Sequence, residues 1–416
     1  MATMQSPRLI ATAGCALALI ACARPSTTPA PAAARIAFAT GDSVAVDAVA
    51  PGIVHYRVTR PRGPFKVQIV TVPVGSRYEL IAARAHDSLF GRERVTDMVR
   101  RRQARGERIP VALNADFFDL RGGTGVNENN QILDGRVWKA NPVTDSPFDT
   151  FRNSHSQFAI GADGRPYLDR FSYAGTLEGG CGRFSLDGIN TVPRVPNALV
   201  LFSSAFGGAS RRDSVHAPRE LAVRATLTPD PGLDSLEIFL EGRTTAATSP
   251  PSIGRDRAVL AAYGSTTSRL DSIARCAGWL RVRHAFRPDR GRLTMIIGGW
   301  PRVVQDGRNV AVLADSLEGT FPRFSAQRHP RSAVGFSRDS SIVFLVAADG
   351  RQETYDGMTL SELGDFLISI GVYQGMNFDG GGSTALVIDG KVVNRPSDAT
   401  GERPVGNAIL VRARSP

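Results

Sequence analysis

Apolar and polar residues alternate along most of this chain with the period of β-strands. The alternation predicts strands within residues 51–90 and a buried strand that runs into a polar turn at 109–119. Residues 131–142 and 157–169 each have an Asp-Gly pair between alternating segments, which predicts two β-hairpins. Further short strands separated by turns are predicted between residues 181 and 300.

Helical periodicity is confined to a few segments. We predict helices near 96–104 and 268–280 and a third over 359–371, where Thr359 is the N-cap, Glu362 follows three residues later and a glycine ends the segment. No fixed-period repeat indicates a solenoid or propeller. The predicted class is therefore α+β, with strand-rich mixed sheets, a few flanking helices and a single catalytic domain.

The first 50 residues differ from the rest. An apolar run at 9–21 is shorter than the roughly 20 residues that span a bilayer, and it ends at Cys22 in a pattern resembling a bacterial lipobox. We expect a lipoprotein signal peptide at 1–22, a Pro/Ala-rich tether at 23–50 and the catalytic domain at 51–416. The protein would then be exported and lipid-anchored in the cell envelope, facing the periplasm or outer membrane in a Gram-negative cell; ordinary secretory cleavage is the alternative.

The mature chain would keep two cysteines, Cys181 and Cys276. Their spacing does not suggest a zinc site. An oxidising compartment would allow a disulfide between them, and two buried free thiols are the alternative.

The positive charge is carried mainly by arginine. The net charge is +11, and among 50 lysine and arginine residues only Lys66, Lys139 and Lys391 are lysines. No nucleic-acid-binding module is recognisable, so we expect no nucleic-acid partner. Because guanidinium pairs phosphate oxygens bidentately, the arginines suit an anionic envelope surface or a phosphate-bearing substrate.

One loop is unusually rich in glycine. The sequence NFDGGGST at 377–384 follows a strand-like segment and precedes a hairpin-like segment at 384–393. A P-loop would need a helix after the glycines and a lysine before the hydroxyl, and neither is present. The backbone N–H groups from Gly380 to Ser383 could form a nest for an anion, and a simple turn is the alternative.

Polar residues gather where predicted strands end or begin. Asn114 and Asp116 end one strand, and Asn377 and Asp379 end another. Sites are commonly built on loops at strand ends, so these side chains are able to meet, but the sequence does not show that Asp116 and Asp379 do. Two further predicted strand ends contribute His329, Arg331, Asp349 and Arg351.

These segments resemble the phosphodiester glycosidase family. The resemblance runs from about residue 95 to 416 and is carried in order by NADFFD, GGWPRVVQDGR, HPRSAVG, AADGRQ, GMTLSELGDFLISIG, MNFDGGGST and VVNRPSDATGERPVGNAIL. It implies a hydrolase that cleaves a glycosyl phosphodiester, such as an N-acetylglucosamine-1-phosphodiester, at the anomeric carbon. The products would be the sugar and a phosphorylated aglycone.

The resemblance also suggests roles for particular residues. Asp379 and Asp116 would act as nucleophile or activate water, because an oxocarbenium-like transition state calls for a nearby carboxylate. Arg331, counted with the catalytic residues, would hold the phosphate together with Arg351 and Arg403. Glu402 is either a third acid or a turn residue paired with Arg403. The remaining expected substrate-binding residues are Asn114, His329, Asp349, Asn377, Gly380, Gly381, Gly382, Ser383 and Asn407, in which the asparagines would bind sugar hydroxyls or orient the carboxylates.

A metal requirement stays open at this stage. Asp116, Asp349 and Asp379 could supply oxygen ligands for calcium or magnesium, although no calcium-loop motif or histidine cluster supports a site. Two other functions compete with the glycosidase. One is a metal-dependent envelope phosphodiesterase that cleaves the P–O bond, and the other is a non-catalytic lipoprotein that binds envelope glycans.

Overall fold

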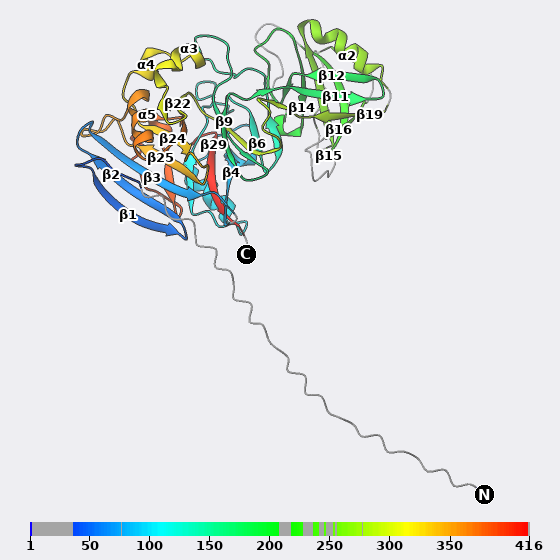
Figure 1. Cartoon of the computed structure of the whole chain (residues 1–416). Coiled ribbons are helices and arrows are strands. Elements are labelled where there is room, and N and C mark those ends of the chain that lie inside the picture. The colour runs from blue at the N-terminus through cyan, green and yellow to red at the C-terminus, as the bar shows by residue number, and fades with distance from the viewer. Residues whose placement is uncertain are drawn as a thin grey trace.

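The structure is a computed structural model that describes residues 36–75, 77–207, 218–227, 236–240, 245–246, 256–276 and 278–414, together with Met1 and Ile253 (Figure 1). The predicted signal peptide, its Cys22 and most of the predicted tether lie outside the described residues. The predictions for these segments therefore stay predictions.

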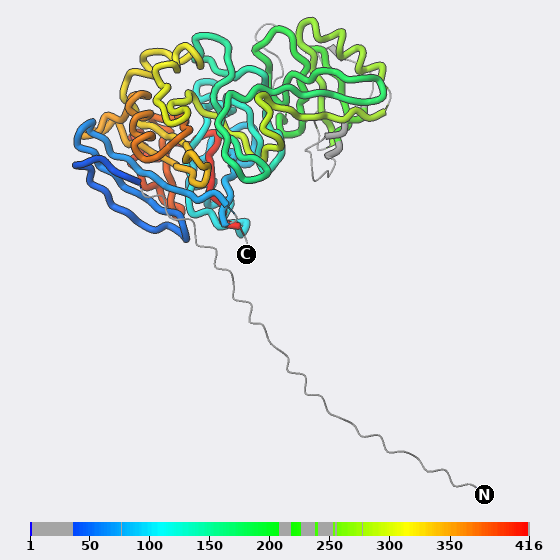
Figure 2. The backbone as a smooth tube through the Cα atoms, viewed as in Figure 1, coloured from blue at the N-terminus to red at the C-terminus, as the bar shows by residue number. Residues whose placement is uncertain are grey.

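The largest sheet of the catalytic part combines both ends of the chain. Its strand order is β1-β2-β3-β25-β24-β26-β22-β23, and all of its pairs are antiparallel. Figure 2 shows the N-terminal strands lying beside segments from the last quarter of the chain. The strands are β1 (Ser43–Ala50), β2 (Ile53–Arg60), β3 (Phe65–Pro73), β22 (Arg302–Gln305), β23 (Arg308–Asn309), β24 (Arg331–Phe336), β25 (Ile342–Ala348) and β26 (Gln374–Phe378).

Two five-stranded sheets pack against this one. Their orders are β28-β27-β5-β29-β4 and β7-β6-β21-β8-β9. A single apolar core joins the three sheets, with Leu345 from the first, Leu113 from the second and Phe158 from the third. The strands are β4 (Tyr78–Arg84), β5 (Val111–Asn114), β6 (Gln131–Leu133), β7 (Arg136–Lys139), β8 (Gln157–Gly161), β9 (Pro166–Asp169), β21 (Leu293–Gly298), β27 (Leu386–Ile388), β28 (Lys391–Val392) and β29 (Asn407–Ala413).

A nine-stranded sheet lies to one side, at the upper right of Figure 1, and has apolar clusters of its own. It is antiparallel except for the parallel pair β13 and β14. A disulfide joins Cys181 to Cys276, so of the two alternatives for these cysteines the structure has the bonded one. The strands are β11 (Gly175–Gly179), β12 (Gly182–Leu186), β13 (Gly188–Ile189), β14 (Ala198–Phe202), β15 (Arg219–Leu227), β16 (Leu236–Leu240), β17 (Thr245–Ala246), β18 (Arg257–Tyr263) and β19 (Trp279–Arg283), and a separate pair is formed by β10 (Ser172–Tyr173) and β20 (Phe286–Arg287).

Helices are short and few in the described part. The predicted helix with a capping box is α5: the Thr359 hydroxyl accepts from the Glu362 N–H, and the Glu362 carboxylate accepts from the Thr359 N–H. Leu363 and Phe366 of α5 pack into the core beside the eight-stranded sheet. The helices are α1 (Val95–Gln103), α2 (Thr267–Ala274), α3 (Ala314–Glu318), α4 (Pro322–Ser325) and α5 (Leu360–Ser369), with single 3-10 turns η1 (Ala85–Asp87), η2 (Ser204–Phe206), η3 (Gly264–Thr266), η4 (Ala311–Leu313) and η5 (Gly381–Ser383).

The fold class was predicted correctly in part. The structure is strand-rich with several sheets and few helices, which makes it mostly β rather than α+β, and nearly all strand pairs are antiparallel. The tether was predicted to extend to residue 50, whereas Ser43–Ala50 forms β1, because its alternating side chains let it pair with β2. Within the described ranges, no helix is long and apolar enough to cross a membrane.

Candidate active site

Two of the predicted strand ends meet. The backbone N–H of Asp379, just after β26, donates to the carbonyl of Ala115, just after β5, at 2.7 Å. The side-chain amide of Asn114 donates to the carbonyl of Asp379 at 2.7 Å. These bonds join the segments that carry Asp116 and Asp379 into one site, which the sequence allowed but did not show.

Asp116 is buried, and its backbone N–H and both of its carboxyl oxygens are hydrogen-bonded. Its backbone N–H donates to Asn407 Oδ1 at 2.9 Å. Its Oδ1 accepts from Asn129 Nδ2 at 2.7 Å, and its Oδ2 accepts from the Asn129 backbone N–H at 3.2 Å. Burial raises the pKa of Asp116 to about 6, against the opposing effects of the Asn129 bonds and of the Lys139 and His155 charges.

Asp379 is the more accessible of the two acids, since its residue is only partly buried. Loss of hydration raises the pKa of Asp379 to about 7. A hydrogen bond with Ser383 and the charge of Arg403 act in the opposite direction, whereas the charge of Asp116 adds to the rise. The charge of Asp116 thus adds to the raised pKa of Asp379, and both carboxyl groups hold their protons to a higher pH than an ordinary aspartate does.

The three glycines allow close approach by other groups. A Cβ on Gly380 would lie 2.4 Å from the carbonyl oxygen of Pro330, and one on Gly381 would lie 3.1 Å from the Arg351 guanidinium. A Cβ on Gly382 would lie 2.1 Å from Arg403 Nη2. Only glycine leaves room for both guanidinium groups against this loop.

The predicted anion nest is wrong for most of the loop. The N–H of Gly381 already donates to Pro330 O at 2.9 Å, and the N–H of Ser383 donates to Gly380 O at 3.1 Å. The Gly380 N–H forms a hydrogen bond with the Asp379 carboxyl group. The positive charge at this loop therefore comes from arginine side chains and not from a set of free backbone donors.

Arg403 and Arg351 both reach the loop. Arg403 makes a bidentate pair with Asp398, at 2.7 and 2.9 Å, and donates to Ser383 Oγ at 3.4 Å. Arg351 is exposed, and its Nη2 lies 3.4 Å from Nδ1 of His329. Arg351, His329 and Arg403 thus lie at the loop as predicted, in a position suited to a phosphate.

Arg331 is buried and bonded to the main chain. Its Nε donates to Met358 O at 2.9 Å, and its Nη2 donates to Phe324 O at 2.7 Å. The guanidinium also lies over the Phe324 ring, 4.9 Å from its centroid, and interacts electrostatically with Arg351. Its predicted catalytic role stays a prediction.

Two other acids with predicted site roles, Glu402 and Asp349, are hydrogen-bonded to other parts of the chain. Glu402 accepts from the N–H of Thr96 at 3.0 Å and from its hydroxyl at 2.6 Å, which binds the first turn of α1. It is therefore neither a third catalytic acid nor the partner of Arg403. Asp349 accepts from the N–H of Arg395 at 2.8 Å and fixes the loop after β28 instead of contacting substrate.

The three predicted asparagines orient the site. Asn114 Oδ1 accepts from Ser332 Oγ at 2.6 Å and from Ala385 N at 3.0 Å, so together with its bond to Asp379 its amide is fully used. Asn407 holds the backbone of Asp116. Asn377 donates to Trp300 O at 2.6 Å, and its buried Oδ1 has no hydrogen-bond partner.

Sequence reasoning missed three polar residues that act on Asp116, namely Asn129, Lys139 and His155. Asn129 lies in a buried run, NENNQ at 127–131. Lys139 is buried and donates to the carbonyls of residues 127 and 128. The His155 ring contacts the Asp149 carboxylate at 2.8 Å and stacks on Trp300 at a centroid distance of 5.0 Å. The signal available in the sequence was this polar run inside an otherwise alternating segment.

The metal requirement that the sequence left open stays open. In the parts of the chain that the structure describes, no three His, Cys, Asp or Glu residues come together in a way that could hold a metal ion. Asp349 is bonded to Arg395 and does not join Asp116 and Asp379. Any cation would therefore have to depend on ligands beyond these three acids.

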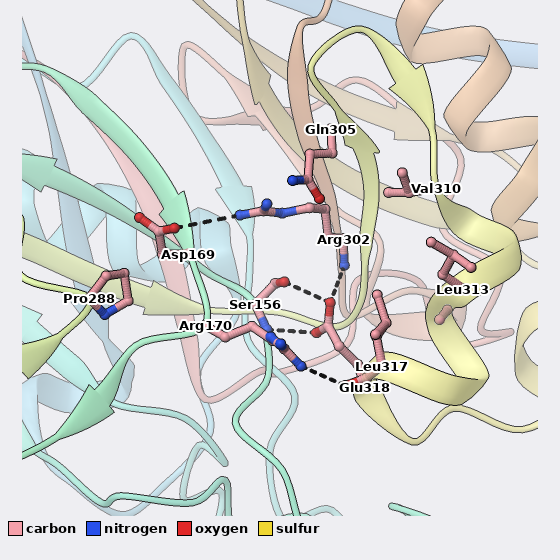
Figure 3. A pocket seen from close by; sticks show the side chains of 11 residues that line it. Ser156, Asp169, Arg170, Pro288, Arg302, Gln305, Val310, Leu313, Leu317 and Glu318 are labelled. Carbon is pink, nitrogen blue, oxygen red and sulfur yellow. Dashed lines mark hydrogen bonds and ion pairs between the residues drawn. The ribbon is translucent and has the colours of Figure 1, made fainter.

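Figure 3 shows the side chains that line a pocket of about 350 Å³. Its lining includes Ser156, Arg302 and Glu318 but neither Asp116 nor Asp379. The Glu318 carboxylate accepts from the N–H and hydroxyl of Ser156, both at 2.7 Å, and from the N–H of Arg302 at 2.9 Å. The indole N–H of Trp300 donates to the Glu318 carbonyl at 2.7 Å, so this cluster fixes the aromatic ring on which His155 stacks.

Comparison with known proteins finds a family match over part of the chain and solved structures with a similar fold. Residues 253–412 match the family model described as phosphodiester glycosidase. The human N-acetylglucosamine-1-phosphodiester alpha-N-acetylglucosaminidase is 38% identical over 80 residues, which covers 19% of this chain and 15% of the human protein. The resemblance to the family is thereby confirmed, although the chain spans less than a fifth of the length of this relative.

Two solved structures share the fold. A hypothetical protein from Synechocystis has a TM-score of 0.68 at 21% identity and covers 89% of this chain and 64% of its own. A putative exported protein from Burkholderia pseudomallei K96243 has a TM-score of 0.62 at 20% identity and covers 84% of this chain and 74% of its own. At such identities the likeness concerns the fold alone.

Proposed function

Taking the phosphodiester glycosidase match over residues 253–412 as the premise, we propose that this protein hydrolyses glycosyl phosphodiesters at the anomeric carbon. The substrate would be similar to an N-acetylglucosamine-1-phosphodiester, and the products would be the sugar and a phosphorylated aglycone. The observation that carries the proposal is the pair of interacting carboxyl groups, Asp116 and Asp379, next to a glycine loop on which two arginines rest.

The reaction needs one proton donor and one negative charge. The oxygen of a water molecule bonds to the anomeric carbon, while the bond from that carbon to the phosphate ester oxygen breaks and its electron pair stays on the oxygen. A proton from the water passes to the ionised carboxylate, and the proton held by the other carboxyl passes to the departing oxygen. A pair of carboxyl groups with raised pKa values meets both needs, because these values are close to the working pH.

The phosphate would be bound by the exposed Arg351 and by the Nη1 group of Arg403, since Nε and Nη2 of Arg403 pair with Asp398. Both guanidinium groups lie within contact of the glycine loop that begins directly after Asp379. Guanidinium binds phosphate oxygens bidentately and keeps its charge at all relevant pH values. A phosphodiester held there would have its ester oxygen near Asp379, since Arg403 interacts electrostatically with that carboxyl group.

The cellular setting is a separate part of the proposal. We propose that the protein is exported and anchored in the cell envelope through a lipid on Cys22, on the support of the apolar run at 9–21 and the small residues that precede this cysteine. Mass spectrometry of the N-terminal peptide from the wild type and from Cys22→Ala tests the anchor. An unmodified wild-type peptide would refute it.

The activity is tested with purified full-length protein in detergent and an N-acetylglucosamine-1-phosphodiester as substrate. We expect free sugar and a phosphorylated aglycone, with turnover lost in Asp379→Asn and in Asp116→Asn. Sugar phosphate as the product would instead indicate cleavage of the P–O bond. No turnover on a panel of glycosyl phosphates would favour a binding protein, and loss of activity with chelator would add calcium or magnesium to the proposal.

A further inference from the structure

Asn129 lies between the acid pair and the rest of the interior. It is fully buried in the loop between β5 and β6. Its side-chain amide and its backbone N–H each donate to a different oxygen of Asp116, at 2.7 and 3.2 Å. Donors to both oxygens favour the ionised carboxylate, because a protonated carboxyl would leave one of these donors poorly paired.

Thr144 determines which way the amide of Asn129 points. The Thr144 hydroxyl donates to Asn129 Oδ1 at 2.9 Å, and the same hydroxyl oxygen accepts from the N–H of His155 at 2.9 Å. The hydroxyl has one proton to donate, and the Asn129 carbonyl oxygen, which can only accept, receives it. The carbonyl of the amide therefore faces Thr144, and its NH₂ group faces Asp116.

We propose that Asn129, oriented by Thr144, is the positioning residue that keeps Asp116 ionised, so that the proton of the acid pair resides on Asp379. This inference rests on the proposed function and divides the work between the two acids. Asp379, the partly exposed member, delivers the proton to the departing phosphate oxygen. Asp116 supplies the negative charge near the anomeric carbon and takes the proton of the attacking water.

Other charges act on Asp116 from each element packed against it. Arg84 at the end of β4 and Lys139 at the end of β7 are fully buried cations. The charged and titratable groups that interact with Asp116 include Arg84, Lys139, Glu128, His155 and Asp379. The cations favour the charge on Asp116 through space, whereas Asn129 acts by direct hydrogen bonds to the carboxylate and so can be removed without changing any charge.

The neighbouring Asn130 offers a matched control. It is also buried, but its amide donates to Phe171 O at 2.9 Å and its carbonyl accepts from Asn141 N at 2.7 Å. Asn130→Ser removes a buried amide of the same size one residue away and leaves the bonds to Asp116 intact. It therefore separates loss of stability from loss of positioning.

The test is a pH titration of the full-length protein labelled with carboxyl-¹³C aspartate, observed by NMR, with signals assigned from Asp116→Asn and Asp379→Asn. In Asn129→Ala we expect the pKa of Asp116 to rise by about one to two units, as loss of a hydrogen bond to a charged group implies. The pKa of Asp379 should fall, because a neutral Asp116 no longer raises it. Thr144→Val should shift both values in the same directions by less, while Thr144→Ser and Asn130→Ser should leave them unchanged.

Unchanged pKa values in folded Asn129→Ala would overturn the inference, as would equal shifts in Asn130→Ser. If Asn129→Ala does not fold, the pair Thr144→Val and Thr144→Ser decides the question, since these two differ in the hydroxyl group. The titration needs no substrate. Failure of all glycosyl phosphates to react would therefore refute the proposed function, while the NMR shifts would still decide the role of Asn129.

Discussion

Replacing Asp379 by asparagine should abolish turnover and stabilise the protein at the same time. Burial raises the pKa of Asp379 from 3.8 to about 7 in the folded state. The unfolded chain releases this proton as the pH rises through its ordinary value, whereas the folded protein keeps it until about pH 7. Folding stability contributed by this group is therefore highest at low pH and falls as the pH rises between these two values.

The size of the effect follows from the same difference. A separation of about 3 pH units between folded and unfolded pKa values, at about 1.4 kcal/mol each, gives an upper bound of about 4 kcal/mol. Asp379→Asn cannot ionise and does not lose this free energy. Relative to wild type, it should be nearly equal in stability at about pH 4 and more stable by up to about 4 kcal/mol at about pH 8.

Urea unfolding followed by circular dichroism at a series of pH values measures this difference. Asp339→Asn serves as the control of opposite sign, because hydrogen bonds from Ser337 and Ser341 lower the pKa of Asp339. Relative to wild type, that variant should become less stable as the pH rises from the lowered folded pKa of Asp339 to its ordinary value of 3.8, and the difference should stay constant at higher pH. Stability curves that run parallel for wild type and Asp379→Asn from acid to alkaline pH would refute the assignment of a buried, proton-holding carboxyl at this position.

Further changes test other parts of the site and the fold. Arg403→Lys removes the bidentate pairing and should raise KM for a glycosyl phosphodiester by about tenfold, near 1.4 kcal/mol, in steady-state kinetics; an unchanged KM would exclude Arg403 from phosphate binding. Gly382→Ala introduces a Cβ 2.1 Å from Arg403 Nη2 and should lower kcat/KM, so wild-type kinetics would contradict the close approach. Glu402→Ala should cost about 1 kcal/mol of stability in urea unfolding by loss of its bonds to α1, with kcat/KM retained; lost activity with intact stability would return Glu402 to the site. Replacing Cys181 and Cys276 by serine should cost about 2 to 5 kcal/mol, and an unaltered melting curve would contradict a stabilising disulfide.

Local sequence signals predicted the elements that local chemistry dictates. The capping box of α5 and the Asp-Gly turns of the β6–β7, β8–β9 and β27–β28 hairpins were all recognisable, because a cap or a left-handed turn needs particular residues at particular positions. Asp134 and Asp389 have φ values of 48° and 47°, and each is followed by glycine, as such turns require. Nothing comparable marks which of several buried polar residues faces a distant carboxylate. Asn129 and Asn130 are adjacent and identical in type, yet only Asn129 contacts Asp116.

The backbone position of Arg331 could be predicted from the sequence, but the bonds of its side chain could not. Arg331 begins β24, which pairs antiparallel with β26, so its backbone lies near the end of β26 and hence near Asp379. The next residue, Ser332, donates to Asn114, whereas Arg331 donates to the carbonyls of Phe324 and Met358 and interacts with Arg351. No local signal in the sequence marks which main-chain carbonyls a buried guanidinium will bind.

The folding free energy that is lost by burying the two carboxyl groups helps to decide between an enzyme and a binding protein. Asp116 is buried and Asp379 is partly buried, loss of hydration raises the pKa of both, and the charge of Asp116 raises that of Asp379 further. Replacing either by asparagine would remove this unfavourable free energy while keeping hydrogen bonds for a sugar, so a glycan-binding protein has no use for two carboxyl groups here. A hydrolase uses both carboxyl groups, because it needs one group that is charged and one that holds a proton at the same pH. The stability that these residues cost the folded protein therefore favours catalysis over binding, and the unfolding experiment on Asp379→Asn measures that cost directly.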